Sequence, residues 1–435
     1  MIIMRIESLE VQNFKGFEHK KLNFSPQFNV LIGNNGSGKT AILDALAVGM
    51  GSLLLGFDGI GSRPIREEEV RHVYRQSGQI TELIPQHPAI VHCVGKINDS
   101  NSISWERRLN KKHGKTTRQH AKTLIQYGEQ LQKKVRDGKP VILPLLSYYS
   151  TARLWLQKKD KVELVKPGSP TSGYVDCLET ASNEKMLMGW IKTMEIEASQ
   201  RQALLQILEG LRDSVKNCLE GCESVYFSVQ LDGLIATFAN GQTLPTYMLS
   251  DGQRTILTMV ADIAYRAAVL NSHLGEKAVL ETPGIVLIDE IDLHLHPEWQ
   301  RTIVEQLRNS FPKIQFIATT HSPIIIQSLR PCEVINLNNE DIGDYYNKGV
   351  EDILEWVMGV ANSPQSERRL KMVETAREYY RLLEQAKETA PEKLGRLKAR
   401  LDELAAPYSD NIAYHAFLQM KREVAGLGDD DNASR

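Results

Sequence analysis

The sequence predicts an α/β protein with a parallel sheet, and two segments about 250 residues apart carry this prediction. The first reads GNNGSGKT at 33–40 and follows a short apolar strand, Phe28–Ile32. The second is the aliphatic run Ile285–Ile288, which ends in Asp289 and Glu290. Such a run is typical of a strand buried on both faces of a parallel sheet. Open α/β sheets bind ligands at the carboxyl ends of their strands, so both segments indicate one site at that edge.

The glycine-rich segment is predicted to bind a nucleoside triphosphate. Its glycines permit turns that expose backbone N–H groups to phosphate oxygens, Lys39 reaches the β- and γ-phosphates, and Thr40 offers its hydroxyl to Mg²⁺. A helix expected from Ala41 to about Met50 adds a favourable N-terminal dipole. The alternative is a glycine-rich turn without a ligand, which the order of strand, loop and helix disfavours. The predicted nucleotide-binding residues here are Gly33, Asn34, Asn35, Gly36, Ser37, Gly38, Lys39, Thr40 and Ala41.

The two acidic residues after the second strand are predicted to serve ATP hydrolysis. Asp289 fits a partner of Mg²⁺, directly or through water, and Glu290 fits the residue that polarises the attacking water. An acidic pair in this place could instead cap the next helix. A third strand, Ile314–Thr319, leads to His321 and places an imidazole within reach of the γ-phosphate, although a lone histidine is more often structural. The sequence therefore predicts an ATPase with Lys39, Glu290 and His321 as catalytic residues and with Thr40 and Asp289 at the metal.

Residues 249–270 predict a capped helix. Ser250 is the expected N-cap, and apolar residues recur on one helical face behind it. By itself this pattern also suits an ordinary amphipathic helix. However, LSDGQ at 249–253 resembles the signature motif of ABC-type ATPases in its RecF/SMC-like form, and IDEIDLHLHP at 288–297 resembles the Walker B motif and D-loop of the OLD-like and RecF-like branch.

This resemblance implies an ABC-type P-loop ATPase head with two lobes, a mixed sheet, a helical insertion and C-terminal charged helices. It implies a homodimer or higher homo-oligomer in which one subunit closes over the ATP bound by the other. The residues of that closing segment are Ser250, Asp251, Gly252 and Gln253. Within the opening segment at 4–40 we also assign Lys15 to the nucleotide site.

A narrower resemblance covers residues 1–365. The opening segment, PLLSYYSTARLW at 144–155 and ILEWVMGV at 353–360 are similar to the PtuA-like ATPases of Septu-type antiphage systems and of some retron systems. The resemblance implies an HNH-type, PtuB-like nuclease as a separate partner, and it leaves binding of DNA or retron nucleic acid possible. After Ser322 we find no counterpart of the TOPRIM nuclease module that OLD-family proteins carry.

Composition is that of an ordinary globular enzyme. Five scattered cysteines without a CxxC pair indicate reduced thiols and no structural metal. The N-terminus has no long apolar core, so we expect neither export nor a membrane span and place the protein in the cytoplasm.

Motif positions and composition divide the chain into seven expected segments. They are an N-terminal ATPase lobe (1–108), a basic linker or insertion (109–139), a return strand and loop (140–182), a helical hairpin (183–224), a C-terminal ATPase lobe (225–361), charged helices for partner docking (362–425) and a disordered acidic tail (426–435). Arg153 or a neighbour is a candidate for sensing the γ-phosphate, but no glutamine stands out for that role.

Charge is unevenly distributed. The net charge is −2, yet Glu106–Lys161 contains fifteen Lys or Arg against four Asp or Glu. This block could bind nucleic acid phosphates, or it could be a solvated helical face. Two other functions stay open: a RecF-like ATPase of DNA repair, and a scaffold that binds ATP without turnover.

Overall fold

The computed structural model of the chain describes most of it. The described residues are 4–77, 80–97, 102–151, 169–179, 184–198, 202–228, 230–231, 233–338, 345, 348–358, 367–387, 398–404, 406–408 and 412–424. Arg153 and the tail at 426–435 lie outside these residues. The chain forms two compact units, Met1–Gly359 and Val360–Arg435.

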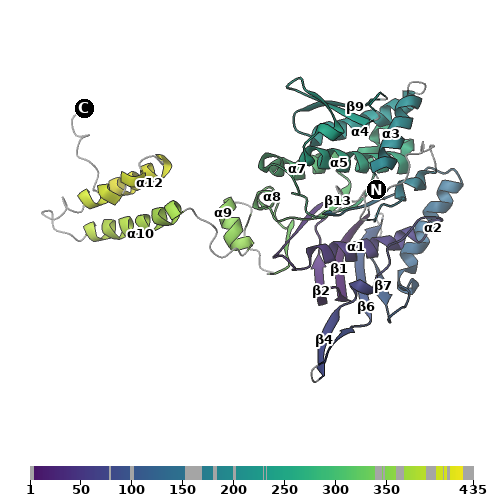
Figure 1. Ribbon diagram of the computed structural model, residues 1–435, viewed down its shortest axis with the longest axis horizontal. Helices are drawn as coiled ribbons and strands as arrows, with labels where there is room; N and C mark the ends of the chain where they lie inside the picture. The colour runs from purple at the N-terminus through teal and green to yellow at the C-terminus, as the bar shows by residue number, and fades with distance from the viewer. Residues whose placement is uncertain are drawn as a thin grey trace. The chain divides into compact units, whose positions relative to one another are not determined.

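A parallel sheet of five strands forms the centre of the first unit (Figure 1). Its order is β14-β3-β13-β12-β8, and every pairing is parallel. The strands are β3 (Phe28–Ile32), β8 (Leu145–Tyr149), β12 (Gly284–Ile288), β13 (Ile314–Thr319) and β14 (Val334–Asn336). All residues of β3, β12 and β13 are buried, as expected for aliphatic strands that are covered on both faces.

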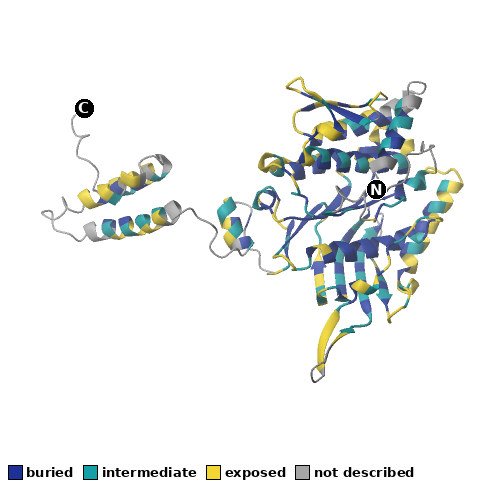
Figure 2. Ribbon diagram, in the orientation of Figure 1, coloured by how far each residue is buried: buried dark blue, intermediate teal, exposed yellow. Residues whose placement is uncertain are grey.

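Helix α1 lies between the parallel sheet and an antiparallel sheet of order β2-β1-β6-β7 (Figure 1). Its strands are β1 (Met4–Phe14), β2 (Phe17–Asn23), β6 (Ala89–Ile97) and β7 (Ile103–Leu109). Helix α1 (Lys39–Leu54) contacts β1, β6 and β7 on one side and β12 and β13 on the other. Every residue of α1 except Thr40 is buried, which appears as a continuous dark ribbon in Figure 2. The helix is longer at both ends than the sequence predicts.

Helix α2 (Lys122–Arg136) lies in the segment that we expected to be a basic linker or insertion. It packs closely on the end of α1, because a Cβ at Gly128 would lie 2.5 Å from the carbonyl oxygen of Leu53. Leu124 and Leu131 are buried, and the basic residues of the helix lie mostly on its exposed side. The segment is therefore part of the first unit's packed structure.

A helical layer covers the other face of the parallel sheet (Figure 1). The predicted helical hairpin consists of α3 (Glu184–Ala198) and α4 (Gln202–Cys218), and α4 packs on α5 (Asp251–Leu270) and α7 (Pro297–Ser310). Next to it lies a three-stranded antiparallel sheet of β9 (Cys222–Ser228), β10 (Gly233–Phe238) and β11 (Thr243–Pro245). The predicted turn residue Asp232 lies outside the described residues.

The remaining elements are short. They include the hairpin β4 (His72–Ser77) and β5 (Ile80–Pro85), the helices α6 (Ala278–Glu281), α8 (Pro323–Gln327) and α9 (Val350–Asp352), a π-helical turn at Ile353–Val357 and several 3₁₀ turns. The second unit contains α10 (Glu367–Lys387) and α12 (Ile412–Val424) around a small core of Tyr379, Leu383, Leu401 and Leu418.

Parallel and antiparallel sheets in one α/β unit confirm the predicted fold class. All five cysteines are free. No helix in the described part of the chain is long and apolar enough to cross a membrane.

Candidate functional site

The glycine-rich loop joins β3 to α1 as the sequence predicts. Gly36 and Gly38 have φ values of +81° and +94°, which favour glycine. Lys39 begins α1, and its ammonium group donates to the carbonyl oxygens of Gly33 at 2.8 Å and Asn34 at 3.1 Å. The loop thus curls around its own lysine, and this lysine is only 8% exposed. Burial lowers the pKa of Lys39 from 10.5, while the negative charges of Asp289, Glu290 and Asp292 oppose this shift. An anion bound in the loop would favour the charged lysine in the same way.

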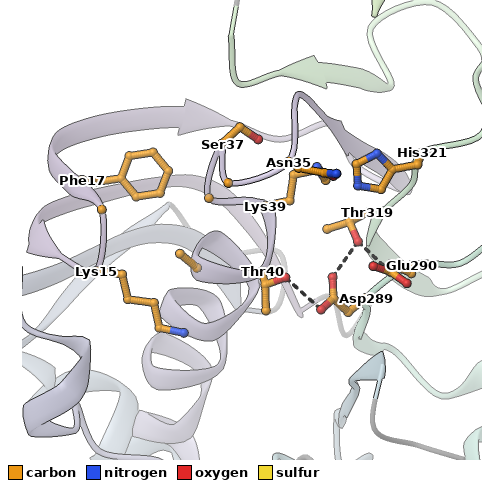
Figure 3. Close-up of a pocket in the computed structure, with 14 residues that line it drawn as sticks. Lys15, Phe17, Asn35, Ser37, Lys39, Thr40, Asp289, Glu290, Thr319 and His321 are labelled. Atoms are coloured by element: carbon orange, nitrogen blue, oxygen red, sulfur yellow. Dashed lines mark hydrogen bonds between the residues drawn. The ribbon is translucent and has the colours of Figure 1, made fainter.

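Asp289 meets the loop at the end of β12. Its carboxylate accepts one hydrogen bond from the Thr40 hydroxyl at 2.9 Å and another from the Thr319 hydroxyl at 2.7 Å (Figure 3). Thr319 ends the neighbouring strand β13, so parallel pairing brings both residues to one edge. The hydroxyl of Thr319 also accepts from the backbone N–H of Glu290 at 2.7 Å. Sequence reasoning named Thr319 only as a strand residue, although its polar side chain at a strand end was a usable signal.

A cavity of about 420 Å³ brings most of the predicted residues together. Its lining includes the predicted residues Lys15, Asn35, Gly36, Ser37, Gly38, Lys39, Thr40, Ala41, Asp289, Glu290 and His321. Gly33 and Asn34 are not among its lining residues, but their carbonyl oxygens accept hydrogen bonds from Lys39. Phe17 and Thr319 also line the cavity and were not predicted. The site is therefore assembled from the glycine-rich loop at 33–40, called the P-loop below, from the carboxyl ends of β12 and β13, and from the turn between β1 and β2.

Glu290 and His321 lie on the same side of the cavity (Figure 3). Glu290 has a φ of +49°, a left-handed conformation that costs about 1 kcal/mol or more in a non-glycine residue. His321 follows β13, and its ring is exposed, while its backbone N–H donates to the carboxylate of Asp292 at 3.4 Å. The same carboxylate accepts from the Thr320 hydroxyl at 2.5 Å. The loop after β12 thus positions the backbone that carries the histidine.

The Lys15 side chain reaches the cavity wall, but its ammonium group forms a salt bridge with Asp44 of α1 and lies 3.9 Å from Glu69. Arg63 pairs with both carboxylates at 2.7 Å. Asp44, Arg63 and Glu69 are buried and Lys15 is partly exposed, so the four side chains form one cluster of two cations and two anions beside the cavity. The sequence does not single out Asp44, Arg63 or Glu69, because nothing local to them signals a contact between β1, α1 and the loop after α1.

Residues 250–253 lie outside the described lining of this cavity. Ser250 is the N-cap of α5, and it forms a reciprocal capping box with Gln253, as predicted for a capped helix. Ser250 and Asp251 are exposed, whereas Gly252 is buried. A Cβ at Gly252 would lie 2.4 Å from the carbonyl oxygen of His294. This glycine therefore allows the start of α5 to touch the loop that follows Glu290.

The oxygen atoms of Thr40 and Asp289 fit Mg²⁺. A hydroxyl and a carboxylate lie 2.9 Å apart beside the P-loop, and Mg²⁺ sites commonly use one or two protein oxygens together with water and substrate phosphates. Within the described residues, no group of three or more His, Cys, Asp or Glu side chains is arranged to hold a metal ion.

Comparison with known proteins matches two family models to the chain. A model described as AAA domain matches residues 8–223, and one described as AAA domain, putative AbiEii toxin, Type IV TA system, matches residues 197–327. The retron Vc95 probable ATPase of Vibrio cholerae serotype O1 biovar El Tor is 27% identical over 78% of this chain and 74% of its own length. The Septu protein PtuA of Bacillus mycoides (strain KBAB4) is 28% identical over 77% of this chain and 41% of its own length.

The chain is therefore similar to PtuA and to the retron probable ATPases. Among solved structures, an SMC head bound to the C-winged helix domain of ScpA is similar with a TM-score of 0.44, 16% identity, and coverage of 76% of this chain and 94% of that one. The relationship to PtuA and the retron ATPases confirms the resemblance to PtuA-like ATPases that the opening segment at 4–40, PLLSYYSTARLW at 144–155 and ILEWVMGV at 353–360 indicate. The first family model also includes the β1–β2 turn and the P-loop in one matched region.

Proposed function

We propose that the chain binds and hydrolyses Mg²⁺·ATP between two copies of itself and thereby controls a separate nuclease in antiphage defence, in the cytoplasm. The observation that carries the proposal is the hydrogen bond from Thr40 to Asp289. It joins the P-loop to the end of β12, so that Lys39, Glu290 and His321 all line one cavity. Phosphoryl transfer depends mainly on such positioning and on electrostatic stabilisation.

In this mechanism each residue has one task. The P-loop N–H groups and Lys39 bind the phosphates, with Lys39 leaving the carbonyl oxygens that it contacts in the structure. Thr40 and Asp289 would hold Mg²⁺, which neutralises charge on the β- and γ-phosphate oxygens. Glu290 orients the attacking water, and His321 helps to sense the transferred phosphoryl group. The local geometry that supports these roles is the Thr319 contact, which fixes Asp289 relative to the backbone of Glu290.

The second copy would contribute Ser250, Asp251, Gly252 and Gln253. Support comes from the exposure of Ser250 and Asp251 at the start of α5, where helix N–H groups and the helix dipole favour an anion. Dimerisation is then part of catalysis, because one chain would supply the phosphate loop and the other the serine-glycine segment.

A complementation experiment tests this arrangement. Lys39→Ala and Ser250→Arg variants should each lack ATPase activity. Mixing the two should restore part of the activity, because a mixed dimer contains one intact P-loop facing one intact Ser250 segment. A mixture that remains as inactive as the separate variants would contradict hydrolysis across the interface, provided that size-exclusion chromatography detects mixed dimers. A mixture of Lys39→Ala with Glu290→Gln is the matched control, since its mixed dimers contain no complete site.

The nuclease partner is proposed to be an HNH-type, PtuB-like protein that docks on the charged helices 362–425. Support comes from the relationship to the Septu protein PtuA and from exposed apolar side chains on these helices. Tyr380 of α10 and Phe417 of α12 contact each other edge to face at 6.3 Å, and Lys421 lies 5.5 Å above Phe417. Tyr380→Glu with Phe417→Glu should abolish co-purification with a PtuB-like protein encoded beside this chain and should leave ATP hydrolysis unchanged. Loss of ATPase activity in this variant would argue against a docking role.

A second candidate function is a RecF-like ATPase of DNA maintenance, which the exposed basic residues favour. Lys111, Lys112, Lys115 and Lys122 are all exposed around the start of α2. This function predicts ATP hydrolysis that duplex DNA stimulates and that charge reversal at Lys111, Lys112 and Lys115 makes independent of DNA. Binding should also weaken steeply with salt. Stimulation by DNA that survives the charge reversal would exclude this surface as the DNA-binding site.

The alternative of a scaffold that binds ATP without turnover predicts that Glu290→Gln does not change the measured rate of hydrolysis.

A further inference from the structure

The end of β14 lies beside the first glycine of the P-loop. Strand β14 pairs in parallel with β3, the strand that leads into this loop. Just after β14, the backbone N–H of Leu337 donates to the carbonyl oxygen of Ile32 at 2.9 Å. Gly33 follows Ile32, and a Cβ added at Gly33 would lie 3.2 Å from the side-chain oxygen of Asn338. A change in the P-loop at Gly33 therefore reaches Asn338 directly.

Asn336, the last residue of β14, joins two backbone segments through one buried amide. Its side-chain oxygen accepts a hydrogen bond from the backbone N–H of Asn338 at 2.9 Å. Its side-chain N–H donates to the carbonyl oxygen of Val357 at 2.8 Å. Because Asn336 is buried, a lost partner would leave a polar group unsatisfied away from water. The side chain thus fixes Asn338 and Val357 relative to each other.

Val357 ends the π-helical turn, which belongs to the ILEWVMGV segment that the proposed mechanism does not use. The backbone N–H of Met358 donates to the carbonyl oxygen of Ile353, five residues back, at 2.9 Å. Such turns are rare, and they are frequent at functional sites. The first unit ends at Gly359, so the turn directly precedes the second unit in the sequence.

Nucleotide binding would alter the P-loop end of this connection. In the structure, the ammonium group of Lys39 donates to the carbonyl oxygen of Gly33. In the proposed mechanism Lys39 turns to the phosphates, and the N–H groups of the loop bind the same ligand. A ligand that binds only the ordered loop stabilises every contact that this order requires, including the one between Gly33 and Asn338.

We propose that Asn336 and Asn338 transmit the nucleotide state of the P-loop to the π-helical turn, so that ATP binding stabilises the segment that precedes the second unit. This inference rests on the proposed function, because it takes ATP binding at the P-loop and nuclease docking on the second unit from there. Opening of the turn breaks the bond between Asn336 and Val357, and this opening becomes rarer when the loop is occupied.

Hydrogen-exchange mass spectrometry of the full chain tests the inference with the non-hydrolysable analogue Mg²⁺·AMP-PNP. At a concentration about a hundredfold above its Kd, the analogue should slow exchange of the amides of Ile353 and Met358 about tenfold or more, with about a hundredfold as the limit. Asn336→Asp keeps the acceptor for Asn338 and loses the donor to Val357. This variant should bind the analogue as the parent does, yet lose the slowing.

Two further variants make the test specific. Asn338→Ala changes an exposed residue and should also reduce the slowing, which provides a second test if Asn336→Asp does not fold. Gln327→Glu is the matched control, because the exposed Gln327 side chain donates to the carbonyl oxygen of Lys348 at 3.2 Å from α8, which packs on the π-helical turn. The control loses the same kind of hydrogen bond and should keep the full response.

Three results would overturn the inference alone. They are a parent that binds the analogue without slower exchange in the turn, a full response in Asn336→Asp or in Asn338→Ala, and an equal loss of response in Gln327→Glu. Failure of the proposed function differs, because the parent would then not bind the analogue, or Lys39→Ala would bind it equally well. The inference would fall with it in that case.

Discussion

The hydroxyl of Thr319 joins Asp289 to Glu290. It donates to the Asp289 carboxylate and accepts from the Glu290 backbone N–H, and both distances are 2.7 Å. Thr319 is completely buried, and it ends the strand next to the one that precedes the two acidic residues. One side chain on β13 therefore controls where the carboxylate beside Thr40 and the backbone of Glu290 lie relative to each other.

Thr319→Val should reduce ATP hydrolysis about tenfold or more and change ATP affinity little. Valine has nearly the shape of threonine, but it leaves the Glu290 N–H and one Asp289 oxygen without this partner in a buried place, a loss of about 1–3 kcal/mol. Steady-state kinetics measures the rate of hydrolysis, and a separate binding experiment measures the ATP affinity. Thr302→Val on α7, where the hydroxyl is exposed, is the control. Equal rates for Thr319→Val and the parent would show that the contact has no catalytic effect.

ATP affinity should decline at alkaline pH earlier than an ordinary lysine would cause. Burial lowers the pKa of Lys39 below 10.5, and a triphosphate binds the charged form. Affinity is therefore complete at neutral pH and is lost as pH rises through the lowered pKa, by up to about tenfold per pH unit. Binding measured from neutral pH upward tests this. Lys39→Arg keeps its charge, so its weaker binding should not vary over this range. An ATP affinity of the parent that stays constant up to pH 10.5 would contradict the prediction.

Gly252→Ala should lower the free energy of unfolding by about 1–3 kcal/mol, because the new Cβ would meet the His294 carbonyl oxygen at 2.4 Å. Urea denaturation of the full chain measures the change. Gly61→Ala is the control, since no atom lies within 4 Å of its added Cβ. If the two variants were equally stable, the loop after Glu290 would have to move aside freely, and the contact would not constrain α5.

Arg63→Met should destabilise the first unit by about 3–5 kcal/mol, because it leaves Asp44 and Glu69 buried with only Lys15 between them. Arg136→Met removes an exposed partner of Asp58 and should change stability by less than about 1 kcal/mol. Denaturant unfolding of both variants provides the comparison. Similar, small effects of the two substitutions would mean that the buried cluster contributes no more than a surface ion pair.

The sequence predicts those parts of the site that depend on local patterns. The P-loop, the strand that ends in Asp289 and the capping box at Ser250 each lie within a few neighbouring residues, so spacing and residue type are sufficient. The positions of Phe17 and Arg63 depend instead on contacts between segments that are far apart in the sequence. The pairing between β1 and β2 places Phe17 on Gly38, and no pattern around residue 17 encodes that approach.

The basic segment shows what its pattern left open. We interpreted it as a linker or insertion that could bind nucleic acid or form a solvated helical face, and its described residues form α2, with Leu124 and Leu131 buried and Gly128 packed against Leu53. A few apolar residues at helical spacing are sufficient to pack this helix on the rest of the unit, because its cationic side chains remain in water on the opposite side.

The burial of α1 also determines how this chain can vary. A helix that is enclosed at every position except Thr40 has no solvent-facing surface on which neutral substitutions accumulate. Random mutagenesis should therefore recover few functional changes between Ala41 and Leu54, and many on the outward side of α2. Resistance to inhibitors that occupy the cavity would then have to arise outside α1, in the β1–β2 turn or in the loops after β12 and β13.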